Sequence, residues 1–547
     1  MAYVTFKVPT RLGSVRKAFI ACFFAFATKG HCLDTLVNSK IDLTKAEAAL
    51  AAGDTLTLAD GNWDDVEIKI SAVGTATQPI LIRAQTPGKA ILGNSSHVTL
   101  DGKYIVVSGL LLQGTSTRSG DAVVFTANSS QCRLTQTAIE GFNSGAARDD
   151  WVTIGGYRNR VDYCSFTVKK NVGICLRLSR EGVLPDGHVI AHNYFGARAV
   201  LNGNGAEEIQ LGLKETQFTE SRTTVEYNLF EDCNGELENV SVKSGGDTLR
   251  FNTFARCQSH LTLRHGSGSV VEGNYIDGQG TAGTGGIRIC GKNHVIVNNF
   301  MTGLRGADEY GGGVNIHGGD ATDPKADPAN HVPAGNCLVA YNTLVDNREG
   351  IVYGGQGGTP PTGITLANNI VMSGTGTLIT MTASTPFAKL DADILSGANP
   401  GIAKQTGLIF EDPKLDKTLL NGYTYYLPGY ASPASGKAVG GYLIPGWPGP
   451  LPPPDIGENL FGPSKLKPLS RAEVGPAWQG GPALGILPAK KGSRKPTGYL
   501  ESAASALRIS GGLFDVRGRL LTLRYPPVVA ARTTLFPQAQ SYLTPFP

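Results

Sequence analysis

The stretches "TTVEYNLF" (Thr223–Phe230) and "DTLRFNTF" (Asp247–Phe254) decide the fold, because they are two clear copies of one pattern. In each copy, apolar residues alternate on both sides of an asparagine, which is Asn228 in the first and Asn252 in the second. The alternation predicts short strands, and the asparagine predicts a bend between them. The two asparagines are 24 residues apart, which predicts a structural repeat.

The same pattern continues along the chain on both sides of this pair. Further copies are marked by Asn193, Asn274, Asn298, Asn342 and Asn368, and variants without the asparagine by Gly109, Thr137 and Cys164. Successive marks are 28, 27, 29, 35, 24, 22, 24, 44 and 26 residues apart, so most steps are 22–29 residues. This period, with no helical pattern between the strands, predicts an all-β solenoid: a right-handed parallel β-helix with three short strands in each coil.

A β-propeller is the main alternative fold, but its blades need about 40 residues, which the shorter steps do not supply. The steps of 35 and 44 residues predict coils with loop insertions. Asparagines stacked at one bend of successive coils are expected to form a hydrogen-bonded ladder, so their recurrence is interpreted as structural.

The ends of the repeat predict the domain organisation. We expect a β-helix over residues 28–440, and "LTKAEAALAAGDTLTLADGNW" (Leu43–Trp63) predicts a capping helix, a glycine turn and the first strand. The segment 441–478 contains the proline-rich "PGWPGPLPPPD" and is expected to be an irregular wrap. The remainder, 479–547, lacks periodicity and is expected to be a poorly ordered tail.

Composition and charge narrow the class of protein. The chain has 547 residues, 71 of them glycine, and a net charge of only +4 with no dense basic run, which argues against a nucleic-acid binder. Residues 1–27 have the features of a signal peptide, with "AFIACFFAFA" (residues 18–27) following several basic residues. This apolar run is too short to span a bilayer. We therefore expect a secreted protein, extracellular or periplasmic, with no membrane partner; the oligomeric state is left open.

The chain has nine cysteines, and Cys22 would be removed with the signal peptide. Cys233 and Cys257 each lie five residues after their asparagine marks, so they are expected to stack in adjacent coils. They would either form a disulfide or pack as small apolar residues, and we favour packing.

Charged residues are concentrated in "NGELENVSVKS" (Asn234–Ser244), which otherwise resembles a strand with Leu237, Val240 and Val242 as its apolar positions. Counted from the asparagine marks, residues at similar offsets in four consecutive coils are expected to share one face. They are Asn204, Glu236, Glu238, Lys243, Arg264, His265 and Arg288.

Glu236 and Glu238 are two residues apart, so they would share one face of a strand. A core position is excluded for two unpaired carboxylates, which places them on an exposed face. With the amide oxygen of Asn204 they form an all-oxygen set suited to Ca²⁺. The competing interpretation is a solvated acidic pair, which the convergence of Lys243 and Arg264 on the same face disfavours.

Such a site suits β-elimination in an anionic uronate polysaccharide. Ca²⁺ would bind the uronate carboxylate and acidify the C5 proton, and Lys243 is expected to remove that proton as base. Arg264 would stabilise the developing negative charge, since its guanidinium is a poor proton donor. His265 or water is then the proton donor, or His265 only positions the substrate. Arg288 is expected to bind a second uronate carboxylate.

The segments "NGNGAEEIQLG", "NGELENVSVKS" and "LTLRHGSGSVVEGNYIDG" resemble polysaccharide lyase family 6, the family of alginate lyases and chondroitinase B. The similarity covers roughly residues 35–475. It implies a right-handed parallel β-helix and calcium-assisted β-elimination. By this resemblance Lys243 is the base, Arg264 the catalytic acid, and Asn204, Glu236 and Glu238 are the calcium ligands.

The resemblance implies a lyase for alginate, with dermatan sulfate or chondroitin as the alternative substrate. A non-catalytic polysaccharide-binding β-helix is a further hypothesis, although it would not need the pair Lys243 and Arg264. A pectate-lyase-like enzyme would use an arginine as base, which the placement of Lys243 disfavours. Two segments depart from the family pattern: "GGGVNIHGGDATDPKADPANH" and the tail after "AEVGP". The first of them bears on substrate specificity.

Overall fold

The computed structural model describes residues 32–145, 148–201, 204–306, 311–320, 327–429, 431–445, 456–457 and 466–484. The signal peptide predicted over 1–27 lies outside the described residues, and of the tail expected over 479–547 only residues 479–484 are described. The chain divides into two compact units, Met1–Ser493 and Arg494–Pro547, and only the first contains described residues.

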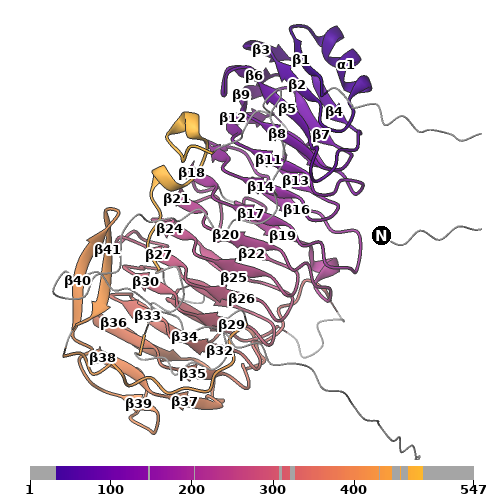
Figure 1. The fold of residues 1–547 in the computed structure, drawn as a ribbon. Coiled ribbons are helices and arrows are strands. Elements are labelled where there is room, and N and C mark those ends of the chain that lie inside the picture. The colour runs from indigo at the N-terminus through magenta and orange to yellow at the C-terminus, as the bar shows by residue number, and fades with distance from the viewer. Residues whose placement is uncertain are drawn as a thin grey trace, which may run out of the picture. The chain divides into compact units, whose positions relative to one another are not determined.

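Three stacks of short parallel strands form a right-handed parallel β-helix, as the repeat predicted (Figure 1). The first stack contains β1 (Asp34–Val37), β2 (Thr55–Leu58), β5 (Ile80–Ala84), β8 (Ile105–Ser108), β11 (Arg133–Thr135), β14 (Arg160–Asp162), β17 (Val189–Ala191), β20 (Thr224–Glu226), β23 (Thr248–Arg250), β26 (Val270–Glu272), β29 (Val295–Val297), β32 (Leu338–Ala340), β35 (Thr365–Ala367) and β37 (Lys389–Asp391).

The second stack contains β3 (Gly61–Asp64), β6 (Ala90–Gly93), β9 (Leu110–Ser116), β12 (Ala138–Ser144), β15 (Ser165–Thr167), β18 (Tyr194–Arg198), β21 (Leu229–Cys233), β24 (Thr253–Ala255), β27 (Tyr275–Asp277), β30 (Phe300–Thr302), β33 (Thr343–Val345), β36 (Ile370–Met381), β38 (Asp393–Asn399) and β39 (Leu408–Ile409).

The third stack contains β4 (Glu67–Ile70), β7 (His97–Leu100), β10 (Val123–Phe125), β13 (Val152–Ile154), β16 (Leu176–Leu178), β19 (Ile209–Leu211), β22 (Glu238–Val242), β25 (His260–Leu263), β28 (Ile287–Ile289), β31 (Val314–His317) and β34 (Glu349–Gly355), and the long β36 extends into it. From β2 to β36, each coil therefore contributes strand residues to all three stacks.

The N-terminal end of the core is covered by the helix α1 (Lys40–Ala49), which confirms the predicted cap. The Ser39 hydroxyl accepts a hydrogen bond from the backbone N–H of Asp42 and so begins the helix. Leu43 is the buried contact of the helix with the core. One detail of the prediction was wrong, because the first strand is β1, which precedes the helix and pairs with β2.

Past β39, the chain forms an antiparallel hairpin of β40 (Leu415–Leu420) and β41 (Tyr423–Pro428). Short 3₁₀ turns follow at Arg471–Glu473 and Ala477–Gln479, and another lies earlier at Lys214–Thr216. The described part of the segment 466–484 returns along the coils: the Leu469 N–H bonds the Thr253 hydroxyl, and the Trp478 indole N–H bonds the Gln136 carbonyl. It thus covers the bend between the first and second stacks.

Apolar side chains repeat in register and fill the interior. Phe166, Phe195, Phe230 and Phe254 stack from coil to coil, with ring centroids 5.0, 4.7 and 4.5 Å apart. Cys233 and Cys257 are both free thiols and buried, which agrees with packing rather than a disulfide. No helix among the described residues is long and apolar enough to cross a membrane.

An asparagine ladder lies at the bend between the first and second stacks. Its members are Asn193, Asn228, Asn252, Asn274, Asn299, Asn342 and Asn369, and it ends on the carboxylate of Asp393. Each asparagine side chain accepts from the backbone N–H of the preceding member and donates to the next member and to a strand carbonyl. The marks Asn298 and Asn368 were wrong by one residue. Both have φ near +58°, the left-handed bend position that Tyr227 and Phe251 occupy in other coils.

Replacing Asn252 with alanine should destabilise the protein by about 2–4 kcal/mol, because several buried polar groups would lose their partners. The Asn252 carboxamide oxygen accepts from both the backbone and side-chain N–H groups of Asn228, and its NH₂ donates to the Val225 carbonyl. Chemical denaturation measures the loss. Asn399→Ala, which removes an exposed asparagine side chain, is the control and should cost less than about 1 kcal/mol. Equal losses in the two variants would contradict a stabilising ladder.

Two buried histidines should make stability fall in mild acid. His188 and His294 each accept a backbone N–H bond at Nδ1, from Asn159 and Ser269 respectively. Burial lowers the pKa of each to about 4. Between the ordinary value near 6.5 and about 4, the unfolded chain binds the proton and the folded chain does not. Stability is therefore retained above pH 6.5 and falls, by about 3 kcal/mol per histidine, as the pH drops towards 4.

The variant His294→Asn tests this pH dependence, because the asparagine oxygen can accept the Ser269 N–H bond without titrating. Denaturation midpoints of the variant and of the unmodified protein are compared between pH 7 and pH 4.5. The variant should lose less stability over this interval. Parallel curves would show that His294 does not contribute to the acid sensitivity.

Candidate active site

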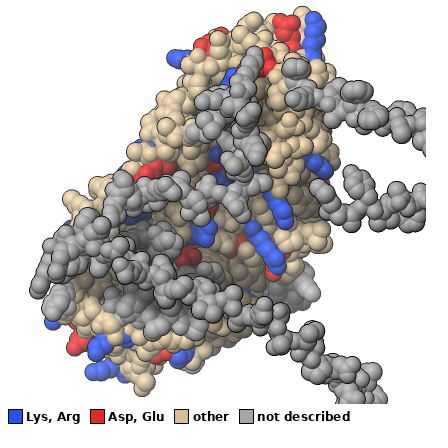
Figure 2. Space-filling model, in the orientation of Figure 1, with Lys and Arg blue, Asp and Glu red and all other residues tan. Residues whose placement is uncertain are grey.

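The charged residues predicted from the sequence gather on the outer face of the third stack. Ser241 of β22 pairs in register with Thr262 of β25, and Thr262 pairs with Arg288 of β28. Lys243 and Arg264 each come two residues after a member of this row and continue the same face. In the face drawn in Figure 2, several Lys and Arg side chains lie among acidic ones over the central coils. Stacking of the coils thus brings together residues that are far apart in sequence.

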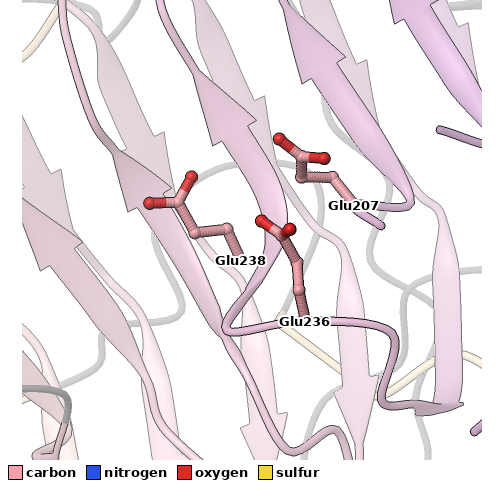
Figure 3. Close-up of side chains that lie close together, drawn as sticks. All are labelled: Glu207, Glu236 and Glu238. Atoms are coloured by element: carbon pink, nitrogen blue, oxygen red, sulfur yellow. The ribbon is translucent and has the colours of Figure 1, made fainter. Parts of the chain in front are cut away.

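Three carboxylates converge at this site: Glu207, Glu236 and Glu238. One oxygen from each lies within 4.8 Å of the others, and Figure 3 shows the three side chains close together, with the Glu236 carboxylate directed toward that of Glu207. Glu238 begins β22, Glu236 comes from the bend before it, and Glu207 comes from the preceding coil, just before β19. One coil therefore supplies Glu236 and Glu238, and the coil before it supplies Glu207.

Glu207 was missed in the sequence analysis, although a signal for it was present. It follows Asn204 by three residues in "NGNGAEEIQLG" and precedes β19 much as Glu238 opens β22. The adjacent Glu208 is also buried, but it pairs with Arg198 at 3.6 Å, on the core side of the coil. Because the two glutamates are neighbours, the sequence alone did not indicate which of them faces the site.

The expectation that both strand glutamates are exposed was wrong for Glu238, whose side chain is 6% exposed. Its burial is possible because Arg264 Nη1 lies 2.9 Å and Arg288 Nη1 3.4 Å from Glu238 Oε1, and the Ser241 hydroxyl donates to the other oxygen. Leu237 is also not a core position, since it is 47% exposed. The strand begins only at Glu238, so alternation does not extend back to Leu237.

The electrostatics differ across the carboxylate cluster. Burial, followed by repulsion from Glu207 and Glu238, raises the pKa of Glu236 to about 7, even though the N–H groups of Gly205 and Ala206 donate to it. Burial also raises the pKa of Glu207, and the positive charge of the nearby Lys243 partly offsets this increase. Burial acts in the same direction on Glu238, but Arg264 and Arg288 outweigh it and hold its pKa below the ordinary value.

The cluster fits a hard divalent cation. The Glu207 Oε2 atom is buried and has no hydrogen-bond partner among the described residues, although a buried polar atom ordinarily has one. Positive charge placed between the three carboxylates would offset the repulsion that helps to raise the pKa of Glu236 and Glu207. Asn204 is exposed and directly precedes Gly205, whose N–H binds Glu236, so it lies beside the cluster. Carboxylate and amide oxygens are the ligands that Ca²⁺ prefers.

The basic residues take different positions around the cluster. Lys243 Nζ lies 3.5 Å from Glu207 Oε1, and the lysine side chain is 14% exposed. Arg264 is 27% exposed, whereas Arg288 is 3% exposed and its Nη2 lies 3.1 Å from His317 Nε2. Lys243 and Arg264 are therefore accessible on adjacent coils, and Arg288 is buried on the next coil, in β28.

His265 follows Arg264 and is 1% exposed. Burial and the positive charge of Arg264 lower its pKa to about 3, so the imidazole is neutral at neutral pH. Its Nδ1 atom is buried and has no hydrogen-bond partner among the described residues.

A parallel β-helix that carries a carboxylate cluster, a lysine and an arginine on one outer face defines the class of this protein. A family model described as Chondroitinase B matches residues 37–418. The protein belongs to this family, polysaccharide lyase family 6.

Solved structures agree with this assignment. The family 6 alginate lyase AlyGC is 32% identical, with a TM-score of 0.68 over 72% of this chain and 55% of its own. This chain thus spans about 55% of the length of AlyGC. A mannuronic acid specific family 6 lyase from human gut microbiota is 28% identical, with a TM-score of 0.62 over 67% of this chain and 87% of its own. A family 6 polysaccharide lyase from Pseudopedobacter saltans is 25% identical, with a TM-score of 0.61 over 81% and 99%. Among curated proteins the comparison found no match.

Proposed function

We propose that the protein is a polysaccharide lyase that cleaves a 4-O-linked uronate polymer, with alginate as its substrate. The observation that carries the proposal is the placement of Lys243 and Arg264 on adjacent coils beside a cluster of three carboxylates. A base, a cation for developing negative charge and an all-oxygen metal site are the groups that elimination next to a carboxylate requires. Similarity to a family 6 alginate lyase at 32% identity and to a mannuronic acid specific family 6 lyase at 28% identity supports alginate as the polymer.

Glu236, Glu238 and Asn204, together with Glu207, would hold Ca²⁺ in this proposal. When bound, the ion would neutralise the substrate carboxylate and make the neighbouring C5 proton more acidic.

Lys243 then takes the C5 proton through its uncharged amine. The electron pair of the C5–H bond forms the C4–C5 double bond, and the C4–O4 bond breaks to release the next sugar. The Arg264 guanidinium stabilises the negative charge that develops as the proton leaves. Its side chain is 27% exposed and its contact with Glu238 holds it in place beside Lys243.

The roles proposed for His265 and Arg288 follow from their surroundings. A neutral His265 with a pKa near 3 is a weak proton donor, so we assign the leaving oxygen's proton to water and a positioning role to His265. Arg288 is the proposed uronate-binding residue. It is also buried and contacts Glu238 and His317, so we propose that it holds these two side chains in place as well.

A dermatan sulfate or chondroitin lyase is the second candidate, which the description of the matching family as Chondroitinase B favours. Both reactions leave an unsaturated uronate that absorbs in the ultraviolet. The purified protein is therefore incubated with alginate, dermatan sulfate and chondroitin, with and without a calcium chelator. We expect product from alginate that chelation abolishes. Product from dermatan sulfate alone would select the second candidate, and none from any uronate polymer would refute the lyase proposal.

We also infer a secreted, extracellular or periplasmic location, where a polymeric substrate is accessible. The inference rests on the signal peptide predicted over residues 1–27. Detection of the protein in the culture medium or periplasm, lacking those residues, would support it.

A further inference from the structure

The segment 327–333, which the sequence did not match to the family pattern, lies against the catalytic face. Hydrogen bonds anchor it at both ends and in the middle: the Gln217 side chain donates to the Pro328 carbonyl (2.9 Å), the Gly291 N–H to the Val332 carbonyl (2.9 Å), and the Asp320 N–H to the His331 carbonyl (3.0 Å). Gln217 lies between β19 and β20, and Gly291 lies two residues after the end of β28. The segment therefore runs beside the same coils that supply Glu207, Lys243 and Arg264.

His331 is the residue that this segment brings to the site. Its ring lies 6.0 Å from that of His265, stacked at 16°, and 5.2 Å from that of His317. His265 adjoins Arg264 in sequence, and His317 contacts Arg288, which in turn contacts Glu238. His331 is thus connected by direct contacts to the residues around the carboxylate cluster.

Asp320 fixes the orientation and the tautomer of His331. The Asp320 Oδ2 atom lies 2.6 Å from His331 Nδ1 and also accepts the backbone N–H of His331 at 2.9 Å. A carboxylate accepts hydrogen bonds, so the ring proton resides on Nδ1 and Nε2 carries the lone pair. Burial and the charges of Arg288 and Arg264 lower the pKa of His331, against the opposing effect of Asp320, which favours the neutral ring.

The Nε2 atom of His331 has no partner to use this lone pair. It is buried and lacks a hydrogen bond among the described residues, and the same holds for Nδ1 of the stacked His265. Burying a polar atom without a partner costs about 1–3 kcal/mol, so a ligand or water that pairs with it would be stabilised. Among the described residues, the group of acidic and histidine side chains close enough to share a metal ion is Glu207, Glu236 and Glu238, which leaves His331 to a different ligand.

We propose that His331 is a substrate-binding residue, whose Nε2 accepts a hydrogen bond from a hydroxyl group of the uronate that lies next to Arg264. This inference rests on the proposed function. A lone pair binds a hydroxyl donor but repels the oxygens of a sulfate ester at the same place. His331 would therefore favour a non-sulfated polyuronate and contribute to substrate choice from a segment outside the repeat.

Two substitutions of His331 separate substrate binding from a structural role. His331→Asn keeps an N–H group near the Nδ1 position for Asp320 but has no atom at the Nε2 position, whereas His331→Ala removes both. The matched control is His97→Asn. His97 begins β7, which pairs with β4 and β10 on the N-terminal coils, away from the site. For each variant, kcat and KM on alginate are measured, together with the melting temperature. Binding of an alginate oligosaccharide is measured by calorimetry in a Lys243→Ala background, where cleavage does not interfere.

We expect His331→Asn to raise KM and the dissociation constant about 10-fold, while kcat stays within about threefold and the melting temperature is unchanged. His331→Ala should weaken binding at least as much. If His331→Asn binds and cleaves like the unmodified protein, or lowers kcat with an unchanged dissociation constant, the inference is overturned. A failure of the proposed function is distinguishable, because then the unmodified protein itself neither binds nor cleaves alginate.

Discussion

Replacing Lys243 with alanine is expected to lower kcat on alginate by about 100- to 10,000-fold, because the variant lacks the group that removes the C5 proton. The melting temperature should change little, since the lysine side chain is partly exposed and its one ion pair with Glu207 is 3.5 Å long. Steady-state kinetics with ultraviolet detection of the product, together with a thermal melt, measures both effects.

The variant Lys243→Arg separates proton removal from electrostatic binding. An arginine keeps the positive charge beside Glu207, but its guanidinium remains protonated and cannot act as base. Both variants should therefore be inactive to a similar degree. Substantial activity in Lys243→Arg would mean that the charge alone matters, and full activity in Lys243→Ala would remove Lys243 from the mechanism.

Replacing Glu236 with glutamine should abolish calcium-dependent activity and weaken calcium binding by at least about 100-fold. Glu236 is the suitable choice within the cluster, because Glu238 also pairs with Arg264 and Arg288 and its loss would leave both unpaired. The hydrogen bonds that Glu236 accepts are from the N–H groups of Gly205 and Ala206, which a glutamine oxygen can still accept.

Calcium binding has a readout that is independent of catalysis. A ligand that binds the folded state raises the melting temperature, and at a given ligand concentration the increase is larger for a smaller dissociation constant. The unmodified protein should melt at a higher temperature when calcium is added after chelation, and Glu236→Gln should not. Glu67→Gln, at a carboxylate that is 55% exposed on the N-terminal coils, is the control and should respond as the unmodified protein does. An equal response in Glu236→Gln would exclude Glu236 as a ligand.

Most of the fold was predictable because each coil of the repeat has a recognisable local sequence pattern. Alternating apolar residues and a recurrent asparagine predicted the coils, and the asparagine ladder confirms the physical interpretation. The marks at Asn298 and Asn368 failed because two asparagines are adjacent there, and sequence does not distinguish the ladder position from the left-handed bend before it. Only the coil geometry makes Asn299 and Asn369 the members of the ladder.

The sequence by itself determined the β-helix, and the repeat length predicted that Glu236, Glu238, Lys243 and Arg264 converge. Strict alternation would place Glu238 on the core side with Val240 and Val242, and the irregularity between Glu238 and Val240 in β22 changes this. Only the tertiary structure decided that Glu207 completes the carboxylate cluster, that Glu238 is buried against Arg264 and Arg288, and that His331 lies against His265. The physical reason is that these contacts join different coils or a loop insertion. Their geometry depends on which way each side chain faces and on where the inserted chain packs, and the period of the repeat specifies neither.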